Sequence, residues 1–457
     1  MQVRISDDAL AIACGADAVA RAFFERGCAV ERTSSWGMHW LEPLVEIDGV
    51  GFGPACVDDV ASILAGTAEH LCIGPIAEHP YIKGQTRLTF ARAGRTRPLS
   101  LDDYAATGGW AGLERARAMD AAAITREVTD SGLRGRGGAG FPAGIKWETV
   151  RTAVGPRKYV VCNADEGDSG SFADRMLMEG DPFCLIEGMA IACLATGADK
   201  GFIYIRSEYP HAIAKMQAAI ELSAAKIAPF IIEVRVGAGA YVCGEETSLL
   251  NSIEGKRGEV RAKPPLPAHK GLFGCPTVIN NVLTLAAIPY ILAEGAKAYA
   301  DFGMGRSRGT MPVQIAGNVR YGGLYETAFG VTLGELVEQI GGGTASGMPV
   351  RAVQVGGPLG AYFPPSLFDT PFDYEAFTAV DGLIGHGGIT VFDDSVDMAK
   401  QARFAFEFCA AESCGKCTPC RIGAVRGRET MDRLIAGEQV GKQKDIIEDL
   451  CETMKLG

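Results

Sequence analysis

The sequence predicts an α/β protein built from several domains. The chain has 457 residues, which is enough for roughly three or four domains of ordinary size. Its central part alternates short apolar runs with longer amphipathic stretches, and its C-terminal part shows only helical spacing. Strands and helices that alternate in this order build a parallel sheet with right-handed crossovers.

The composition is that of a soluble globular protein. Hydrophobic residues make up 47% and charged residues 22% of the chain, and the net charge of −11 argues against a nucleic-acid partner. No apolar run reaches the roughly 18 residues that a membrane span needs, and the longest candidate, 282–293, contains Pro289. The N-terminus has no basic start followed by an apolar core, so we expect a cytoplasmic protein.

Residues 1–95 are predicted to form a small α/β domain, with helices over 8–25 and 58–65 and a strand over 44–47. Its four cysteines are at least fourteen residues apart, so they are not expected to bind a metal. Residues 96–130 are predicted to be a connector with one helix over 120–129.

The third segment, residues 131–305, begins with the glycine-rich stretch SGLRGRGGAGFPAGIKW over 131–147. Glycines allow positive φ and close backbone approach to a ligand. Arg134, Arg136 and Lys146 add positive charge, so the expected ligand carries phosphate. A flexible surface loop is the alternative, because a GxGxxG match alone is weak.

After this stretch the periodicity becomes regular. Strands are predicted at 159–162, 202–205 and 231–236, and helices at 182–196, 212–225, 246–253 and 278–292, the last opening with two asparagines. Ligands of parallel sheets bind beyond the carboxyl ends of the strands. Asn163, Asp165, Asn280 and Asn281 are polar residues at such ends, although each by itself is typical of a turn or cap.

Residues 306–394 are predicted to form a compact β-rich module, with strands at 313–316, 353–355 and 390–392 and one helix at 333–340. We expect no chemically reactive residue in it.

Residues 395–457 are predicted to be helical and contain the run ESCGKCTPCR. The spacing of Cys414, Cys417 and Cys420 favours an iron–sulfur cluster over zinc, which usually takes two separated C-x-x-C pairs. A cubic cluster needs a fourth ligand, for which Cys409 and Cys451 are the nearest cysteines. A cluster and a nucleotide site in one chain indicate a flavin between them, because a flavin exchanges both electron pairs and single electrons.

Six ordered motifs now permit a family comparison. GLRGRGGAGFPAGIKW, CNADEGDSGSFADR, GAGAYVCGEETSLL, KPPLPA, PTVINNV and ESCGKCTPCRIG resemble the NADH-oxidising flavoprotein subunit of respiratory complex I and its soluble relatives, over residues 125–457. The DEGDSGSF and VRAKPPLPA versions of the motifs most resemble the beta (diaphorase) subunit of NAD-dependent, molybdenum-containing formate dehydrogenases.

The resemblance implies four folded parts. Residues 1–95 would be a thioredoxin-like domain without cluster ligands, 131–305 a Rossmann-like FMN- and NAD-binding domain, 306–394 a β-grasp (soluble-ligand-binding) domain and 395–457 a helical bundle with a [4Fe–4S] cluster.

The resemblance also implies site residues. The glycine loop would lie between FMN and NAD(H), with Phe141 stacked on the dinucleotide; its glycines are Gly135, Gly137, Gly138 and Gly140. The residues implied to contact FMN are Lys146, Asn163, Asp165, Glu166, Tyr241, Gly244, Glu245, Glu246, Asn280, Asn281 and Thr284. Those implied to face NAD(H) are Asp168, Glu246 and Lys263, and the implied cluster ligands are Cys414, Cys417 and Cys420. No side chain is expected to act as a catalytic group, because hydride passes directly between the two cofactors.

Three departures from the family pattern stand out. Asp168 replaces a common Glu, and Thr149 and Leu266 replace common aromatic residues, so adenine stacking would depend more on Phe141. The family's fourth cluster cysteine is expected beyond Gly457, which would make this sequence a truncated one and Cys451 a packing residue.

The resemblance implies a diaphorase subunit that passes electrons between a [4Fe–4S] cluster and NAD(H) through FMN. The expected partners are a molybdenum-containing catalytic subunit and a small [2Fe–2S] subunit of a formate dehydrogenase. The equivalent subunit of an NAD-reducing hydrogenase or of NADH:quinone oxidoreductase is the first alternative. A non-catalytic ligand-binding scaffold with structural zinc is the second.

Overall fold

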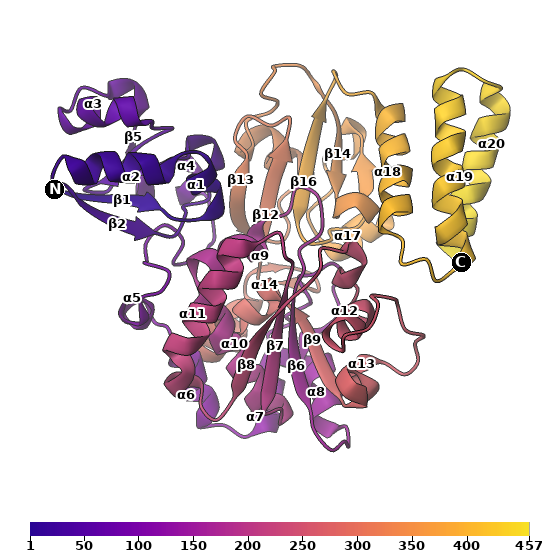
Figure 1. Ribbon diagram of the computed structural model, residues 1–457, viewed down its shortest axis with the longest axis horizontal. Helices are drawn as coiled ribbons and strands as arrows, with labels where there is room; N and C mark the ends of the chain where they lie inside the picture. Colours follow the sequence, from indigo (N-terminus) through magenta and orange to yellow (C-terminus); the bar gives the residue numbers. More distant parts are fainter. Residues whose placement is uncertain (457) are drawn as a thin grey trace.

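The N-terminal domain is a five-stranded mixed sheet flanked by short helices (Figure 1). The computed structural model describes residues 1–456. The strands follow the order β2-β1-β3-β4-β5, in which β1 and β2 are parallel and the rest antiparallel. This is the thioredoxin-like arrangement expected for this part of the chain. The predicted helix over 8–25 is two helices, because Gly15 adopts φ 105° between them.

The elements of this domain are β1 (Gln2–Ser6), α1 (Ala9–Ala13), α2 (Ala16–Glu25), β2 (Ala29–Thr33), β3 (Val45–Ile47), β4 (Val50–Phe52), α3 (Val60–Leu64), β5 (Cys72–Pro75) and α4 (Pro80–Lys83).

Three helices connect this domain to the glycine-rich loop: α5 (Leu101–Ala106), α6 (Ala111–Arg117) and α7 (Ala121–Asp130). They are part of the central domain's core, since Trp110, Leu113, Ile124 and Val128 are buried there. Helix α7 matches the helix predicted over 120–129.

A four-stranded parallel sheet in the order β8-β7-β6-β9 forms the central domain. Its strands are β6 (Tyr159–Ala164), β7 (Lys200–Ile205), β8 (Ile231–Val236) and β9 (Thr277–Asn281). Its helices are α8 (Ala143–Thr152), α9 (Ala173–Gly180), α10 (Pro182–Thr196), α11 (Pro210–Ile227), α12 (Glu246–Ile253), α13 (Pro267–Lys270), α14 (Val282–Ala286), α15 (Ile288–Glu294) and α16 (Ala296–Ala300).

The prediction of a helix over 278–292 is wrong for its first residues, 278–281. Residues Thr277–Asn281 form β9, which pairs with β6, and the helices begin only at Val282. Val278 and Ile279 are buried in the sheet, where β-branched side chains pack well. Asn281 then ends the strand and caps α14 by accepting a hydrogen bond from the Leu283 N–H.

Residues 310–393 contain the expected β-grasp sheet, in the order β13-β12-β16-β14-β15 with β12 and β16 parallel at its centre. Its strands are β12 (Thr310–Gly317), β13 (Gly323–Ala328), β14 (Val350–Val355), β15 (Ala361–Phe363) and β16 (Gly388–Asp393). A small hairpin of β10 (Gly303–Met304) and β11 (Ser307–Arg308) precedes it, and α17 (Tyr374–Ala379) lies before β16. The predicted helix at 333–340 is present, with Glu335–Ile340 wound as a π-helix.

Three helices form the C-terminal part: α18 (Met398–Glu412), α19 (Thr418–Ile435) and α20 (Val440–Leu456). They pack in sequence against one another at one edge of the molecule, and α18 contacts the Gly357–Leu359 turn of the β-grasp domain (Figure 1). None of the described helices is both long and apolar enough to cross a membrane.

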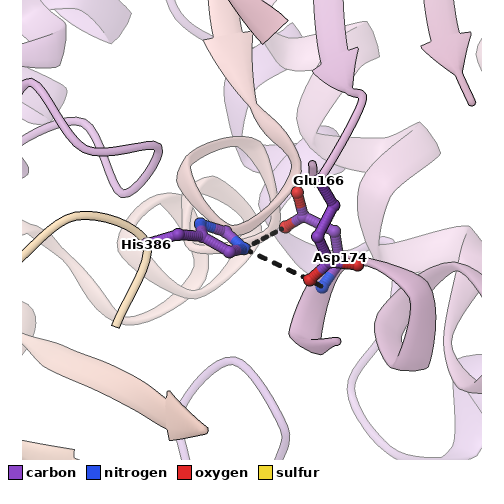
Figure 2. A group of neighbouring side chains, drawn as sticks. All are labelled: Glu166, Asp174 and His386. Carbon is purple, nitrogen blue, oxygen red and sulfur yellow. Dashed lines mark hydrogen bonds and ion pairs between the residues drawn. The ribbon is translucent and has the colours of Figure 1, made fainter. Parts of the chain in front are cut away.

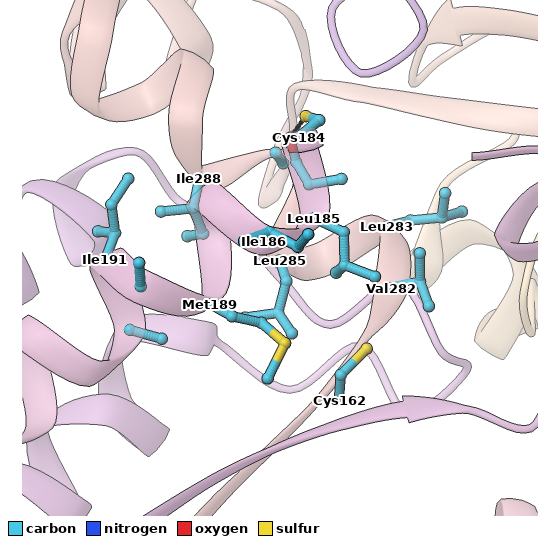
Figure 3. Close-up of a cluster of buried hydrophobic side chains, with 14 of the residues drawn as sticks. Cys162, Cys184, Leu185, Ile186, Met189, Ile191, Val282, Leu283, Leu285 and Ile288 are labelled. Carbon is cyan, nitrogen blue, oxygen red and sulfur yellow. Dashed lines mark hydrogen bonds between the residues drawn. The ribbon is translucent and has the colours of Figure 1, made fainter. Parts of the chain in front are cut away.

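The largest core lies around α10, which is buried on all sides between the parallel sheet and α14 (Figure 3). Cys162, Cys184 and Cys193 are packed inside it as small apolar residues, as expected. A second core joins the N-terminal domain to the β-grasp domain, since Leu41 and Tyr81 pack with Val313 and Leu336.

Candidate cofactor-binding site

One cavity of about 600 Å³ opens where the central sheet, the β-grasp domain and the C-terminal helices meet. It lies beyond the carboxyl ends of β6 and β9, where ligands of parallel sheets bind. Its volume is within the usual range for a small-molecule site. The predicted site residues that line it are Gly137, Gly138, Asn163, Asp165, Glu166, Asp168, Tyr241, Gly244, Glu245, Asn281, Cys414, Cys417 and Cys420.

The glycine-rich loop forms one wall of the cavity. A Cβ at position 137 would lie 2.9 Å from the Asn281 Cβ, so only glycine fits there. Gly138 has φ 117° and forms an isolated bridge with Gly385 of the β-grasp domain. The loop is therefore packed against Asn281 and the β-grasp domain. It is not the flexible surface loop that the sequence left as an alternative.

The two arginines of this loop are not placed as expected. Arg136 is 1% exposed, and its guanidinium donates to the carbonyl oxygens of Arg134, Arg308 and Thr310 and to the Tyr299 hydroxyl. Arg134 donates to the Gly140 carbonyl and pairs with Glu375. Because neither side chain lines the cavity, both serve to anchor the loop and neither supplies the expected phosphate-facing charge.

A layer behind the cavity contains Asn280, Thr284 and Lys146. The Asn280 Oδ1 accepts a hydrogen bond from the Trp147 indole at 2.8 Å. The Thr284 Oγ1 accepts one from the Arg136 backbone N–H at 2.8 Å. Lys146 donates to the Ile279 carbonyl, and burial lowers its pKa. These three residues hold the cavity wall in place.

The loop after β6 supplies the polar floor. Asn163 donates to the Gly244 carbonyl at 2.7 Å, and the Tyr241 hydroxyl donates to Asp168 at 2.7 Å. Asp165 is 3% exposed, and burial raises its pKa to about 7. Burial also raises the pKa of Asp168. At neutral pH the Asp165 carboxyl therefore carries a proton part of the time and can then donate a hydrogen bond.

Lys263 lies at the rim of this region, where its ammonium donates to Glu245 and Glu246 at 2.9 Å each. Phe141 is 49% exposed and lies beside the cavity without lining it. Gly135 and Gly140 are likewise in the loop but outside the lining. The stacking role of Phe141 stays a prediction.

Glu166, Asp174 and His386 form a buried group at the cavity wall (Figure 2). The His386 Nε2 lies 3.1 Å from the Asp174 Oδ1 and 3.4 Å from the Glu166 Oε1. Burial alone lowers the pKa of His386, but the two carboxylates, Asp174 foremost, raise it well above its usual value. The β-grasp segment, which was expected to hold no chemically reactive residue, therefore contributes a titratable side chain to the cavity wall.

Sequence reasoning missed both Asp174 and His386. Asp174 lies inside the motif CNADEGDSGSFADR, and His386 lies in the glycine-rich run GHGG. A lone histidine between glycines was the only available signal, and nothing in the spacing connects it to Asp174.

The C-terminal helices bring the three cysteines to the same cavity. Cys417 is the N-cap of α19 and Cys420 lies in its first turn. Phe408 packs edge-on against Tyr241 with ring centroids 4.9 Å apart, and Glu412 accepts a hydrogen bond from the Tyr241 N–H. Cys409 also lines the cavity, whereas Cys451 is exposed on α20. The three cysteines therefore line the same cavity as the polar side chains at the strand ends.

Comparisons with known proteins agree with this geometry. Residues 128–290 match the Nuo51 FMN-binding domain, and residues 400–457 match the NADH-ubiquinone oxidoreductase-F iron-sulfur binding region. The NADP-reducing hydrogenase subunit HndC of Solidesulfovibrio fructosivorans is 43% identical over 383 residues, which are 82% of this chain and 78% of that protein. The matching NADH-quinone oxidoreductase subunit of Escherichia coli is 36% identical over 382 residues, covering 81% and 86%.

A crystal structure of an NAD⁺-reducing [NiFe]-hydrogenase in the H₂-reduced state contains a chain of similar fold. The TM-score is 0.73 at 31% sequence identity, over 100% of this chain and 80% of that one.

Fold and site together define an NAD(H)-linked flavoprotein with an FMN-binding domain and a [4Fe–4S]-binding region. More particularly, the chain belongs to the family of FMN-binding subunits of NADH-quinone oxidoreductases and related hydrogenases, and it is a diaphorase-type oxidoreductase subunit. This assignment favours an iron–sulfur cluster over structural zinc at the cysteines.

The residues present fit a flavin nucleotide. The backbone at Gly137 has no room for a side chain, and a Cβ at Gly244 would lie 3.2 Å from the Asp165 Oδ2. The amide and carboxyl groups of Asn163, Asp165 and Asn281 surround the same space, and this donor set suits a ligand rich in oxygen and nitrogen.

Proposed function

We propose that this chain is the diaphorase subunit of an NAD-dependent, molybdenum-containing formate dehydrogenase. It would pass electrons between a [4Fe–4S] cluster and NAD(H) through FMN. The observation that carries the proposal is the single cavity lined both by the glycine loop with its polar floor and by Cys414, Cys417 and Cys420. Such a shared space keeps the distance between the two redox centres short.

The finer assignment to formate dehydrogenase is supported by the DEGDSGSF and VRAKPPLPA motif versions. The N-terminal domain supports it as well, because its cysteines are dispersed: Cys28 is buried, whereas Cys14, Cys56 and Cys72 are exposed at separate places along the chain.

The residues proposed to hold FMN are Lys146, Asn163, Asp165, Glu166, Tyr241, Gly244, Glu245, Glu246, Asn280, Asn281 and Thr284. FMN, when bound, exchanges electron pairs with a nicotinamide and single electrons with an iron–sulfur cluster. The chain's own part is to bind and orient. Gly137 and Gly138 permit close backbone approach, and Phe408 and Tyr241 pack against each other on the side of the cavity next to the cysteines.

Asp168, Glu246 and Lys263 are proposed to face NAD(H), with Phe141 stacked on it. Asp168 is held toward the cavity by the Tyr241 hydroxyl. Lys263 is held by Glu245 and Glu246. No side-chain nucleophile or obligatory general base is needed, because proximity of the reacting rings supplies most of the rate.

The proposed partners are a molybdenum-containing catalytic subunit, where formate is oxidised, and a small [2Fe–2S] subunit. We place the complex in the cytoplasm. An NAD-reducing hydrogenase is the second candidate, and the observation in its favour is the fold similarity that extends over the whole chain.

The intact complex should be purified through a tag on this chain and analysed for metals and for substrate-dependent NAD⁺ reduction. Molybdenum together with formate-dependent NADH formation supports the proposal. Nickel with hydrogen-dependent reduction would assign the chain to a hydrogenase, and quinone-linked partners would assign it to NADH:quinone oxidoreductase. A purified chain with neither flavin nor NADH:ferricyanide activity would contradict the diaphorase role itself.

A further inference from the structure

His386 reaches the cavity wall from the β-grasp domain, whereas its two acidic neighbours belong to the central domain (Figure 2). All three are nearly buried: His386 is 5%, Glu166 8% and Asp174 0% exposed. The His386 Nε2 and the Asp174 Oδ1 have no hydrogen-bond partner of good geometry. The short distances between these three side chains are therefore contacts between charged groups and not well-formed hydrogen bonds.

The surroundings determine the protonation state of His386. Its Nδ1 lies 2.9 Å from the Arg136 carbonyl oxygen, which can only accept, so Nδ1 carries a proton. Its Nε2 faces two carboxylates, and an unprotonated nitrogen there would set a lone pair against their oxygens. A proton on both nitrogens makes the ring an imidazolium cation.

Among residues 1–456, no lysine or arginine side chain forms an ion pair with Glu166 or Asp174 in place of His386. The Arg136 guanidinium donates to backbone carbonyls, Arg175 pairs with Asp8 and Glu179, and Arg206 donates to the Glu166 backbone carbonyl. The remaining contacts are neutral donors: Asn281 to Asp174, and the Asp174 and Arg175 N–H groups to Glu166. Asp168 is a further acidic group that faces the histidine.

We propose that His386 is a positioning residue of the flavin site, whose imidazolium balances the negative charge of the buried Glu166 and Asp174 pair and ties the cavity wall to the glycine-rich loop through the Arg136 carbonyl. The proposal rests on FMN occupying this cavity. Without the cation, two buried carboxylates would face each other, and one would take up a proton. The charge next to the flavin would then change with pH.

The test compares full-length wild type with His386→Gln, which removes the charge, and with His386→Gln/Asp174→Asn, which restores the net charge of the group. His211→Gln, on the exposed side of α11, controls for loss of a histidine. The flavin midpoint potential is measured by spectroelectrochemistry from pH 6 to pH 8. The unfolding temperature of flavin-free protein is measured over the same range, and zinc is measured by mass spectrometry.

At pH 8 we expect His386→Gln to disfavour flavin reduction at least tenfold, about 30 mV for a two-electron couple. The shift should shrink toward pH 6, where one carboxyl takes up the missing proton. The double variant should recover wild-type values within threefold, since a charge effect is compensated whereas lost packing is not. In flavin-free wild type, the stability supplied by the raised histidine pKa is present at pH 6 and declines as the pH rises, and His386→Gln should lack this decline.

Each other outcome counts against the proposal. An unchanged potential, or losses that simply add in the double variant, would show that the charge is not used. One zinc per chain that disappears in His386→Gln would show that a metal and not a proton joins the three side chains. If wild type holds no flavin, the proposed function fails; identical stability profiles in flavin-free wild type and His386→Gln would separately overturn the role of His386.

Discussion

Asn281 determines which residue can occupy position 137 of the glycine-rich loop. The Asn281 side chain donates to Asp174 at 2.7 Å and accepts from the Leu283 N–H, so it is held from both ends. A Cβ at position 137 would come within 2.9 Å of it. The backbone of the loop can therefore approach a ligand only because residue 137 has no side chain.

Gly137→Ala should lower FMN affinity at least tenfold, equal to about 1.4 kcal/mol, because either the loop or Asn281 must move. Gly135→Ala is the matched control in the same loop, since its Cβ would meet its nearest atom at an ordinary 3.6 Å. Flavin content and fluorescence titration of the apoprotein measure the effect. Equal flavin affinity of the two variants would refute this account of the loop.

Asp165 should make stability depend on pH. Its folded pKa is raised to about 7 by burial, against an unfolded value of about 3.9. The unfolded chain therefore releases the proton first, and wild type loses stability as the pH rises from about 4 to about 7. Asp165→Asn should raise the unfolding temperature at pH 8 by about 3 °C or more while changing little at pH 4.

The control for Asp165 is Asp369→Asn, an exposed aspartate of the β-grasp domain. Calorimetry of the flavin-free chain at both pH values is the measurement. A difference between Asp165→Asn and wild type that is the same at pH 4 and pH 8 would exclude the proposed titration.

At the scale of elements, the start of α19 carries two of the three proposed cluster cysteines. Cys417 caps the helix with an extended backbone, Pro419 follows in the first turn, and Cys420 projects from the same turn. The loop between α18 and α19 places Cys414 on the same cavity. The start of α19 therefore places Cys417 and Cys420 on the cavity, and the loop that carries Cys414 is tied to the central domain by hydrogen bonds of Arg257 and Lys416.

Cys417→Ser should abolish the EPR signal of the dithionite-reduced cluster but leave NADH:ferricyanide activity within about twofold, because ferricyanide can take electrons directly from reduced flavin. Cys451→Ser, at an exposed position of α20, should leave both the signal and the activity unchanged. Loss of the EPR signal in Cys451→Ser would instead make this residue a cluster ligand.

At the scale of the whole molecule, the N-terminal domain is fused to the β-grasp domain through a shared core. Tyr81 is 6% exposed and packs edge-on against Trp40 and Tyr325, the latter across the domain boundary. Its hydroxyl has no hydrogen-bond partner. The aromatic ring stabilises this boundary, whereas the buried hydroxyl destabilises it.

Tyr81→Ala should lower the free energy of unfolding by about 3 kcal/mol, as expected for removal of a buried aromatic ring. Tyr81→Phe should be neutral or stabilising by up to about 1 kcal/mol, since it removes only the unpaired hydroxyl. Differential scanning calorimetry measures both. Destabilisation by Tyr81→Phe would indicate that the hydroxyl has a partner in solution.

The elements that the sequence predicted well are those whose pattern is local. Helix α10 and strand β8 match their predicted bounds, because a capping turn, a glycine stop or a β-branched run belongs to the segment itself. The residues of β9 were predicted as helix, because a short apolar run shows neither helical nor strand periodicity clearly. Its pairing with β6 makes this segment a strand.

What the sequence by itself determined is the chemistry available in this protein: the cysteine spacing, the glycine loop and the polar ends of the strands, all of which depend on residues close together in the chain. Only the tertiary structure shows that the Arg136 side chain lies away from the cavity. It also shows that His386, 250 positions later in the chain, contacts the Arg136 carbonyl. Such contacts depend on how whole domains pack, because the charge and burial of a side chain are set by neighbours that no local pattern specifies.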